Sequence, residues 1–224
     1  MKKVIICGYR DWADELYNFL NHKPKFSDKS FIYVNNNEVL MDTVKESKPE
    51  FIFFVGWSWI VSEDIIKKYK CICLHPSPLP KYRGGSPIQH QIINGEKESA
   101  VTLFEMDEGL DTGDILYQKS FSLDGDLKDI FNRIIEIGYE GILNILGGNY
   151  TVTKQNDKRS TFYNRRTEDM SEINIGDISN FTAEELHNKV RALQYPYPNA
   201  YIRCKDNTKL FITNTNLGEN DETN

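Results

Sequence analysis

The first half of the chain alternates short apolar runs with amphipathic stretches, and this alternation limits the folds that it can adopt. Four runs have the length and composition of buried strands, at residues 4–7, 31–34, 51–55 and 71–74. Stretches with helical spacing of apolar residues lie between them. Strands that alternate with helices form a largely parallel sheet covered on both faces. The sequence therefore predicts an α/β fold with a Rossmann-like core and a mostly parallel sheet.

The second half of the chain is predicted to extend this sheet and to end in a smaller unit. Two strands, two helices and a closing hairpin are expected at residues 99–104, 114–123, 126–146, 182–193 and 201–213. The longer helix keeps its apolar spacing until Gly147 and Gly148 stop it. We expect a main catalytic domain at residues 1–180 and a short extension, one helix and one β-hairpin, at residues 181–224.

Composition and charge argue against several classes of protein. With 224 residues, 39% of them hydrophobic, the chain is long enough for one domain with a full core. Its formal net charge of −6 argues against a nucleic-acid partner, because phosphate binding needs a basic face. No apolar run approaches the roughly 20 residues that span a bilayer, so no membrane partner is expected. The N-terminal residues lead straight into a strand without a cleavage site, so we expect no signal peptide.

The four cysteines favour reduced thiols rather than a metal site. Cys71 and Cys73 lie two apart on one strand, a spacing rarely used for a metal or a disulfide. The first loop, at residues 8–12, also lacks the Gly-x-Gly-x-x-Gly pattern that lets a backbone approach a pyrophosphate. We therefore predict neither a metal nor a dinucleotide cofactor.

A histidine ends the fourth predicted strand and begins a loop stiffened by proline. Pro76, Pro78 and Pro80 lack an amide donor and have a fixed φ, so this segment must be a rigid, extended loop. A second loop, at residues 105–114, presents several carboxylates among glycines. The two loops are therefore the best candidates for a functional site.

His75 and Asp111, one on each loop, are expected to meet at one edge of the sheet. In an open α/β sheet, ligands collect beyond the carboxyl ends of the strands. The turns after the first, third, fourth and fifth predicted strands should all lie at that edge, and two of them hold this pair. An imidazole and a carboxylate on rigid loops are the parts of an acid–base site.

The same two loops carry a family resemblance. The chain reads Cys-Leu-His-Pro-Ser-Pro-Leu-Pro from residue 73, Arg-Gly at 83–84 and Leu-Asp-Thr-Gly at 110–113. This resembles the signature of the folate-dependent formyltransferases, which reads Asn-x-His-x-Ser-x-Leu-Pro, then Arg-Gly, then Leu-Asp-x-Gly. The resemblance covers roughly residues 1–193 in the order of elements. It implies a formyltransferase core and 10-formyltetrahydrofolate as the co-substrate.

The resemblance implies that a primary amine attacks the formyl carbon. His75, paired with Asp111, would move protons and help to stabilise the oxyanion. Asp111 would orient the imidazole and favour its charged form. Cys73 stands where the family has asparagine, and a thiol is a weaker donor than an amide. Because loss of one oxyanion donor typically costs about 10²–10³ in rate, Cys73 is the third candidate catalytic position.

Cys73 also leaves alternatives open. It could be the nucleophile of a Cys–His dyad, although residues two apart on a strand share a face without an enforced hydrogen bond. It could also mark a ligand-binding pseudoenzyme, in which the pocket persists without the chemistry. The enzymatic alternative is a formyltransferase for a different small amine.

The resemblance assigns the pterin ring of the donor to two loops. Trp57, Trp59 and Ile60 follow the third predicted strand and correspond to the turn that lines the pterin pocket in the family. The acid loop, with Asp107 and Gly109, would close the other side of the ring. These five residues are the predicted cofactor-binding set.

The downstream segments resemble those of enzymes that formylate nucleotide-linked amino sugars. The likeness lies in residues 162–169 and 187–201. Arg165 and Arg166 could pair with a pyrophosphate, because guanidinium geometry suits bidentate contacts. Tyr197 could stack on a base or pack the hairpin.

Sugar or phosphate contacts are also expected from three residues at the entrance of the candidate site, namely Arg10, Tyr82 and Arg83. Two other classes of acceptor fit less well. A relative that acts on glycinamide ribonucleotide usually has a glycine-rich first loop, which residues 9–12 do not resemble. A relative that acts on methionyl-tRNA carries a basic C-terminal barrel, whereas the segment after residue 193 is short and the chain is acidic.

The sequence therefore predicts an N-formyltransferase that acts on a dTDP- or UDP-linked amino-dideoxysugar for surface polysaccharide synthesis. A cytoplasmic location is expected from the folate donor and from the absence of targeting signals. The nucleotide-linked amino sugar is the expected partner, and a homodimer through the C-terminal hairpin is left open.

Overall fold

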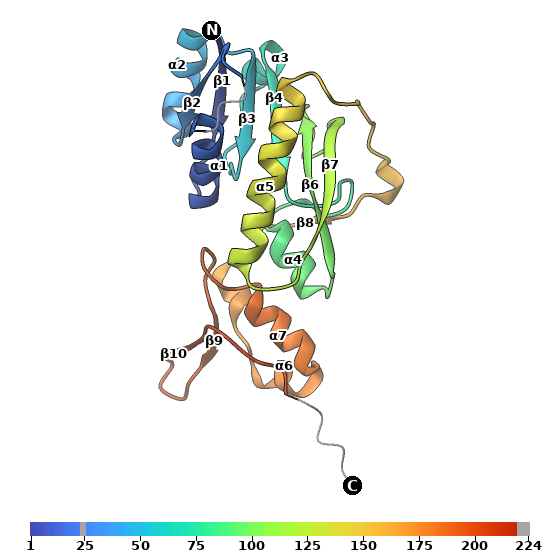
Figure 1. Cartoon of the computed structure of the whole chain (residues 1–224). Coiled ribbons are helices and arrows are strands. Elements are labelled where there is room, and N and C mark those ends of the chain that lie inside the picture. The colour runs from blue at the N-terminus through green and yellow to red at the C-terminus, as the bar shows by residue number, and fades with distance from the viewer. Residues whose placement is uncertain (23–25, 219–224) are drawn as a thin grey trace.

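The computed structural model describes residues 1–22 and 26–218, and its centre is a six-stranded sheet (Figure 1). The strand order is β2-β1-β3-β4-β6-β7. The first four strands are parallel, and the last two pair antiparallel. The strands are β1 Lys2–Cys7, β2 Lys29–Val34, β3 Phe51–Val55, β4 Lys70–His75, β6 Glu98–Glu105 and β7 Ile115–Ser122. The predicted mostly parallel α/β fold is confirmed.

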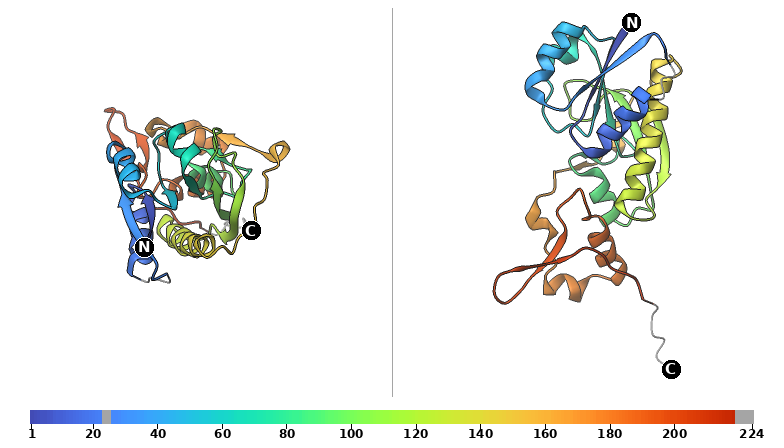
Figure 2. Two further views of the ribbon diagram at one scale, coloured as in Figure 1. Left: turned by 90° about the horizontal axis from the view of Figure 1, so that it is seen from above. Right: turned by 60° about the vertical axis from the view of Figure 1, so that its left-hand side comes forward.

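Helices cover both faces of the sheet, as Figure 2 shows from two sides. The helices α1 (Asp11–His22) and α5 (Leu127–Leu146) lie on one face, and α2 (Asn37–Ser47) and α3 (Glu63–Lys68) lie on the other. Alternate residues of β1 enter the two cores, so the strand reads as a continuous apolar run. Each fully buried aliphatic side chain stabilises the fold by roughly 1.5–3 kcal/mol.

Two glycines of helix α5 face the sheet and leave no room for a side chain. A Cβ added at Gly138 would come within 2.6 Å of Leu74, and one at Gly141 within 2.5 Å of Leu103. The helix starts at a capping box in which Asp126 and Asp129 each accept from the other's backbone N–H. The predicted helix at residues 126–146 is thus confirmed, and it presses directly on β4 and β6.

The direction of β6 differs from the prediction. We expected the strand at residues 99–104 to end at the same edge as β4, but β6 runs antiparallel to β4, with His75 opposite Thr102. A parallel return needs a crossover over a face of the sheet. The connection holds only a proline loop and the seven-residue helix α4 (Pro87–Ile93), and it places β6 in the opposite direction.

The C-terminal part forms a smaller unit beyond the start of α5 (Figure 1). It contains α6 (Ile175–Asn180), α7 (Ala183–Arg191) and the hairpin of β9 (Ala200–Arg203) and β10 (Lys209–Ile212). The predicted helix and hairpin are therefore present. Its small core includes Ile173, which precedes the predicted boundary at residue 181, and residues 219–224 lie outside the described residues.

A short two-stranded sheet joins the segment between β7 and α6 to the proline loop that follows β4. Strand β5 (Arg83–Gly84) pairs in parallel with β8 (Phe162–Tyr163). The segment between β7 and α6 also holds two 3₁₀ turns, at Asp157–Arg159 and Glu168–Ser171. No pattern in the sequence predicted this small sheet of β5 and β8, which lies beside the candidate site.

Two findings concern the described residues as a set. Within residues 1–22 and 26–218, no helix has both the length and the apolar character needed to cross a membrane. In the same ranges, no cluster of three or more histidine, cysteine, aspartate or glutamate side chains could hold a metal ion.

Candidate functional site

The structure brings Cys73, His75 and Asp111 together. The first two side chains share one face of β4, because residues two apart on a strand point the same way. The loop after β6 turns back over that face and places Asp111 Oδ2 3.7 Å from His75 Nδ1. The two side chains are 8% and 12% exposed, so the pair is nearly buried but still reaches the surface.

The imidazole of His75 has a defined protonation pattern. Nε2 lies 2.8 Å from the carbonyl oxygen of Tyr82. A carbonyl oxygen only accepts hydrogen bonds, so Nε2 must carry a proton and donate it. Nδ1, which faces the Asp111 carboxylate, is therefore the atom that gains and loses a proton.

Asp111 is held by its backbone as well as by its carboxylate. Oδ2 accepts a 2.8 Å hydrogen bond from the amide of Gly84, two residues after Tyr82. The residue has φ of 55°, a left-handed conformation that aspartate adopts more readily than most residues other than glycine. At the neighbouring Gly113, a Cβ would lie 1.7 Å from a backbone oxygen, so this turn requires glycine there.

Gln155 stabilises this strained turn, and the sequence analysis missed it. Its amide nitrogen donates to the backbone oxygens of Asp111 (2.9 Å) and Gly113 (2.8 Å). Its amide oxygen accepts from Arg83, whose guanidinium also bonds Asp157 at 2.8 Å. A lone glutamine in an irregular segment forms no motif, so its sequence context gave no signal of this role.

Arg83 and Tyr82 do not occupy the positions predicted for them. The Arg83 side chain is only 9% exposed and is held by Gln155 and Asp157. Tyr82 is buried, donates its hydroxyl to Glu96 at 2.8 Å and stacks on Tyr163. The predicted sugar or phosphate contacts are corrected accordingly, because both side chains hold the loop rather than face its exterior.

The protonation state of Cys73 argues against a nucleophilic dyad. Burial raises the pKa of this thiol well above its ordinary value, and the nearby Asp111 carboxylate adds to the effect. A thiolate is the reactive form of cysteine. Both ring nitrogens of His75 also face other groups, the Tyr82 carbonyl and the Asp111 carboxylate. Cys73 is thus a neutral neighbour of the pair.

The loop after β3 presents aromatic and apolar side chains. Trp57 packs against Trp59, with ring centroids 4.7 Å apart, and its indole nitrogen is buried without a hydrogen-bond partner among the described residues. Trp59 is 42% exposed and Ile60 is 94% exposed. This loop can therefore offer an unused donor and two apolar surfaces to a flat ring.

The acid loop is shaped by internal bonds. Asp107 accepts from the backbone of Gly109 at 3.0 Å and from Thr112 at 2.7 Å. A Cβ at Gly109 would lie 2.0 Å from the Thr112 hydroxyl, so the turn is closed tightly. Glu108 forms a 2.9 Å ion pair with Lys67 of α3. This pair ties the acid loop to the helix that follows the aromatic loop.

Two arginines gather around Ser58 at the carboxyl ends of β1 and β3. Both terminal nitrogens of Arg165 lie 3.1 Å from the Ser58 hydroxyl, which is 2.5 Å from the hydroxyl of Tyr9. The guanidinium of Arg10 lies 4.7 Å from the centre of the Tyr9 ring. Within residues 1–22 and 26–218, neither guanidinium forms an ion pair with a carboxylate. The cluster can therefore receive an anion.

The tyrosine pKa values support this grouping. Burial tends to raise the pKa of Tyr9, but the Ser58 hydrogen bond and the charges of Arg10 and Arg165 outweigh it and lower the pKa. Burial raises the pKa of Tyr197 to about 12, while the same two arginines act in the opposite direction. Tyr197 therefore lies near the arginine cluster, and its role as a substrate contact stays a prediction.

Arg166 lies apart from this cluster. Its Nη2 donates to the backbone oxygen of Met170 at 2.6 Å, and its backbone amide donates to Ser86 at 3.1 Å. Burial lowers the pKa of its guanidinium. The placement does not support the predicted pyrophosphate contact of Arg166, because this guanidinium is turned toward its own chain segment.

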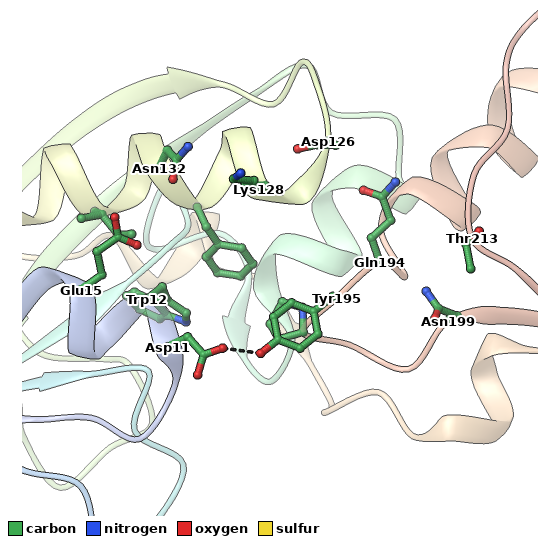
Figure 3. A pocket seen from close by; sticks show the side chains of 13 residues that line it. Asp11, Trp12, Glu15, Asp126, Lys128, Asn132, Gln194, Tyr195, Asn199 and Thr213 are labelled. Carbon is green, nitrogen blue, oxygen red and sulfur yellow. Dashed lines mark hydrogen bonds between the residues drawn. The ribbon is translucent and has the colours of Figure 1, made fainter.

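A cavity of about 630 Å³ lies between α1, α5 and residues 194–199 (Figure 3). Asp11 and Trp12 of α1, Phe131 of α5 and Tyr195 are among the residues that line it. A second cavity, of about 710 Å³, lies along β7. Neither is lined by His75 or Asp111.

Comparison with known proteins places the chain in a defined group. The family model described as formyl transferase matches residues 6–146, and the model for the formyl transferase C-terminal domain matches residues 177–224. A methionyl-tRNA formyltransferase of Clostridium beijerinckii is 39% identical over 184 residues, which are 78% of this chain and 58% of the relative. The chain spans just over half the length of the curated relatives it matches, from 52% to 62%.

Solved structures share the fold over nearly the whole chain. A methionyl-tRNA formyltransferase from Clostridium thermocellum superposes with a TM-score of 0.83 at 29% identity, over 92% of this chain and 89% of that one. A 4-N formyltransferase from Francisella tularensis gives 0.76 at 22% identity, over 97% and 98%. HypX from Aquifex aeolicus, in complex with tetrahydrofolic acid, gives 0.78 at 20% identity, over 96% and 37%. At these last two identities, the likeness is one of fold.

Proposed function

The chain belongs to the formyl transferase family, and from this premise we propose that it transfers a formyl group from 10-formyltetrahydrofolate to the amine of a nucleotide-linked amino sugar. The proposed acceptor is an amino-dideoxysugar on dTDP or UDP, and the product would enter a surface polysaccharide of the lipopolysaccharide type. The reaction is proposed for the cytoplasm, where the folate donor is available. The observation that carries the proposal is the 3.7 Å approach of His75 to Asp111.

The aromatic loop fits the pterin end of the donor. Trp57 has a buried N–H without a partner among the described residues, which can bond a ring heteroatom. Trp59 and Ile60 are exposed enough to cover an apolar ring face. Asp107 and Gly109 shape the acid loop, which the Glu108–Lys67 pair ties to α3 next to this loop. When bound, the donor would supply the formyl carbon and a leaving nitrogen.

His75 would carry the protons of the transfer. The amine that forms the new C–N bond must lose a proton, and the nitrogen released from the old C–N bond must gain one. Nδ1 is the basic atom available for both tasks, since Nε2 donates to Tyr82. Asp111, whose carboxylate lies 3.7 Å from Nδ1, would orient the imidazole during both steps.

Cys73 would face the oxygen that becomes negative during attack. Its thiol stays protonated, because burial and Asp111 raise its pKa. A neutral thiol can donate a hydrogen bond, although a weaker one than an amide. We therefore expect Cys73 to support the reaction more weakly than the asparagine of the family signature, rather than to form a covalent intermediate.

The order of groups around the site supports the proposed acceptor. The arginine cluster of Arg10 and Arg165 lies next to Gly85, because Gly85 packs directly on the backbone of Arg165. The preceding residue, Gly84, bonds Asp111. Residues 84 and 85 therefore connect the cluster to the catalytic pair. In a nucleotide-linked amino sugar, the diphosphate follows the sugar that carries the amine.

Methionyl-tRNA is the second candidate acceptor, and the 39% identity to a methionyl-tRNA formyltransferase favours it. In an aminoacyl-tRNA, however, the amine is followed by the terminal adenosine, and only then by a phosphate. The arginine cluster is connected to the catalytic pair through Gly84 and Gly85, and this order of groups favours the sugar nucleotide. The formal net charge of −6 also disfavours a polyanionic acceptor.

The decisive experiment offers both acceptors to the same preparation. The full chain is incubated with 10-formyltetrahydrofolate and either a panel of dTDP- and UDP-linked amino sugars or charged initiator tRNA, and products are identified by mass spectrometry. One sugar nucleotide should gain a formyl group, and His75→Ala should lower this rate by about 10²–10⁴ with little change in Tm. Formylation of methionyl-tRNA alone would reassign the acceptor. Binding of folate without any product would support the pseudoenzyme alternative.

The oligomeric state stays a prediction. Leu210 and Phe211 of the C-terminal hairpin are 55% and 54% exposed, which is compatible with a homodimer through this element. Sedimentation of the wild type and of Phe211→Ser tests it, since the substitution should shift a dimer toward monomers.

A further inference from the structure

We infer that the cavity between α1, α5 and residues 194–199 receives the nucleoside of the acceptor. This inference rests on the proposed function and extends it, because it assigns a place to the part of the acceptor farthest from the amine. The cavity volume of about 630 Å³ lies within the range of roughly 300–1,000 Å³ that is usual for small-molecule sites.

The walls of the cavity suit a flat heterocycle. Trp12 and Phe131 stack with ring centroids 5.8 Å apart. Tyr195 reaches from the C-terminal segment toward α1, where its hydroxyl donates to Asp11 (Figure 3). Aromatic side chains hold nucleobases by stacking, and they do so for any base because each base has a π face. The cavity therefore offers a stacking site made by three separate elements.

The charges around the cavity select the nucleoside rather than the phosphates. Asp11, Glu15 and Asp126 contribute three carboxylates to the lining, against the one cation of Lys128. A diphosphate would be repelled from this environment. A nucleoside is neutral and carries hydroxyl and ring N–H donors, which carboxylates accept well.

The cavity adjoins the arginine cluster through two side chains. Tyr197 lies 6.2 Å from Phe131, measured between ring centroids, and its pKa responds to Arg10 and Arg165. Trp12 lines the cavity, and both Trp12 and Arg10 pack on Gly56 at the end of β3. The site for an anion and the site for a heterocycle are therefore neighbours.

A continuous series of contacts connects the catalytic pair to the cavity. Asp111 bonds Gly84, and the next residue packs on Arg165. Arg165 bonds Ser58 and through it approaches Tyr9 and the rest of the arginine cluster. The order is catalytic pair, cationic cluster and aromatic cavity. A nucleotide-linked amino sugar has the same order of amine, diphosphate and nucleoside, so one extended molecule can occupy all three.

The test blocks the cavity without touching the other two sites. Asn132→Trp places a bulky ring at the cavity lining, on an exposed position of α5. Glu136→Trp is the matched control, because it adds the same ring one helical turn away at an exposed position outside the lining. Calorimetry then measures the affinity for dTDP, for UDP and for inorganic pyrophosphate.

The expected result separates the nucleoside from the phosphates. Asn132→Trp should weaken binding of dTDP or UDP at least tenfold and leave pyrophosphate binding within about twofold, whereas Glu136→Trp should bind both as the wild type does. Arg165→Ala should weaken both. Equal nucleotide affinity in Asn132→Trp and wild type would overturn the inference, even if sugar formylation is observed. Wild type that formylates only methionyl-tRNA would instead overturn the proposed function.

A second pair of variants guards against an indirect effect of the new ring. Tyr195 is 74% exposed, so its replacement should leave the fold intact. Tyr195→Ala should weaken dTDP binding, and Tyr195→Phe, which keeps the ring and loses only the bond to Asp11, should restore most of it. Equal affinity in both variants and the wild type would remove Tyr195 from the site and contradict the stacking assignment.

Discussion

At the scale of single residues, the candidate site is defined by the hydrogen bonds that its atoms already make. Nε2 of His75 is bonded to Tyr82, and Oδ2 of Asp111 accepts from Gly84. Both partners belong to residues 82–84, so one short stretch of backbone fixes the imidazole and the carboxylate at the same time. What remains available is Nδ1 of His75 and the thiol of Cys73.

Cys73→Asn is expected to raise kcat by about 10- to 100-fold, because an amide is a stronger donor to the oxyanion than a thiol. Steady-state kinetics with the proposed acceptor measures this change. Cys71→Ala is the matched control, since Cys71 lies two residues earlier on the same face of β4 but is buried in the core, and it should leave kcat nearly unchanged. Complete inactivity of Cys73→Asn would mean that the thiol has a chemical role of its own.

Gln155→Ala is expected to lower kcat by about tenfold or more with little effect on KM, because a displacement of about 1 Å at a catalytic group can cost 10²-fold. The substitution frees the backbone oxygens of Asp111 and Gly113 and lets the carboxylate move. Lys154→Ala, at the exposed neighbouring position, is the control. A rise in KM with unchanged kcat would instead give Gln155 a role in binding.

At the scale of elements, close packing of α5 on the sheet sets the geometry of the site. Gly138 faces Leu74, the residue immediately before His75, and Gly141 faces Leu103 of β6. The same helix carries Phe131 to the cavity wall. The separation between helix and sheet therefore influences both the catalytic strand and the cavity.

Gly141→Ala is expected to lower Tm, although alanine normally stabilises a helix by about 1 kcal/mol relative to glycine. The new Cβ would lie 2.5 Å from Leu103 and 2.7 Å from Tyr117, and the helix would have to move away. Glu136→Ala on the exposed side of α5 should change Tm very little. Thermal unfolding followed by circular dichroism decides, and a higher Tm for Gly141→Ala would contradict the packing argument.

Elements with regular periodicity could be predicted from the sequence, and those made by distant contacts could not. The strands of the parallel half, α5 and the C-terminal hairpin all follow from local patterns. The direction of β6 depends on how its connection packs, which no local pattern encodes. The small sheet of β5 and β8 has two residues in each strand, too few for any periodic signal.

The residues of the candidate site also divide into those that the sequence predicted and those that it did not. The motifs predicted that His75 and Asp111 meet, and they do, although the loop reaches the pair from a different direction than expected. Arg83 and Tyr82 were assigned from proximity in sequence to the motif, but burial turned both inward. Gln155 became visible only when the fold brought residues more than 40 positions apart into contact.

At the scale of the whole molecule, buried thiols link stability to pH. Burial raises the pKa of Cys71 to about 12, above its ordinary value of 9.0. Between these values the folded thiol keeps its proton and the unfolded thiol loses it. The stabilisation is therefore complete below pH 9 and is lost as pH rises toward 12.

The free energy of unfolding is expected to fall by about 1.4 kcal/mol per pH unit in this window for such a thiol. Urea unfolding at pH 8 and pH 10 measures the change, and the comparison of wild type with Cys71→Val isolates this group from other titrating side chains. The variant should lose less stability between the two pH values. An identical loss in both proteins would show that Cys71 ionises equally in the folded and unfolded states.

The bond between His75 and the Tyr82 carbonyl has a consequence for how the whole molecule would work. With one edge of the ring anchored, a single nitrogen must serve both reactants, and both must approach it from the same side. Nδ1 would accept the proton from the amine and then donate it to the folate nitrogen.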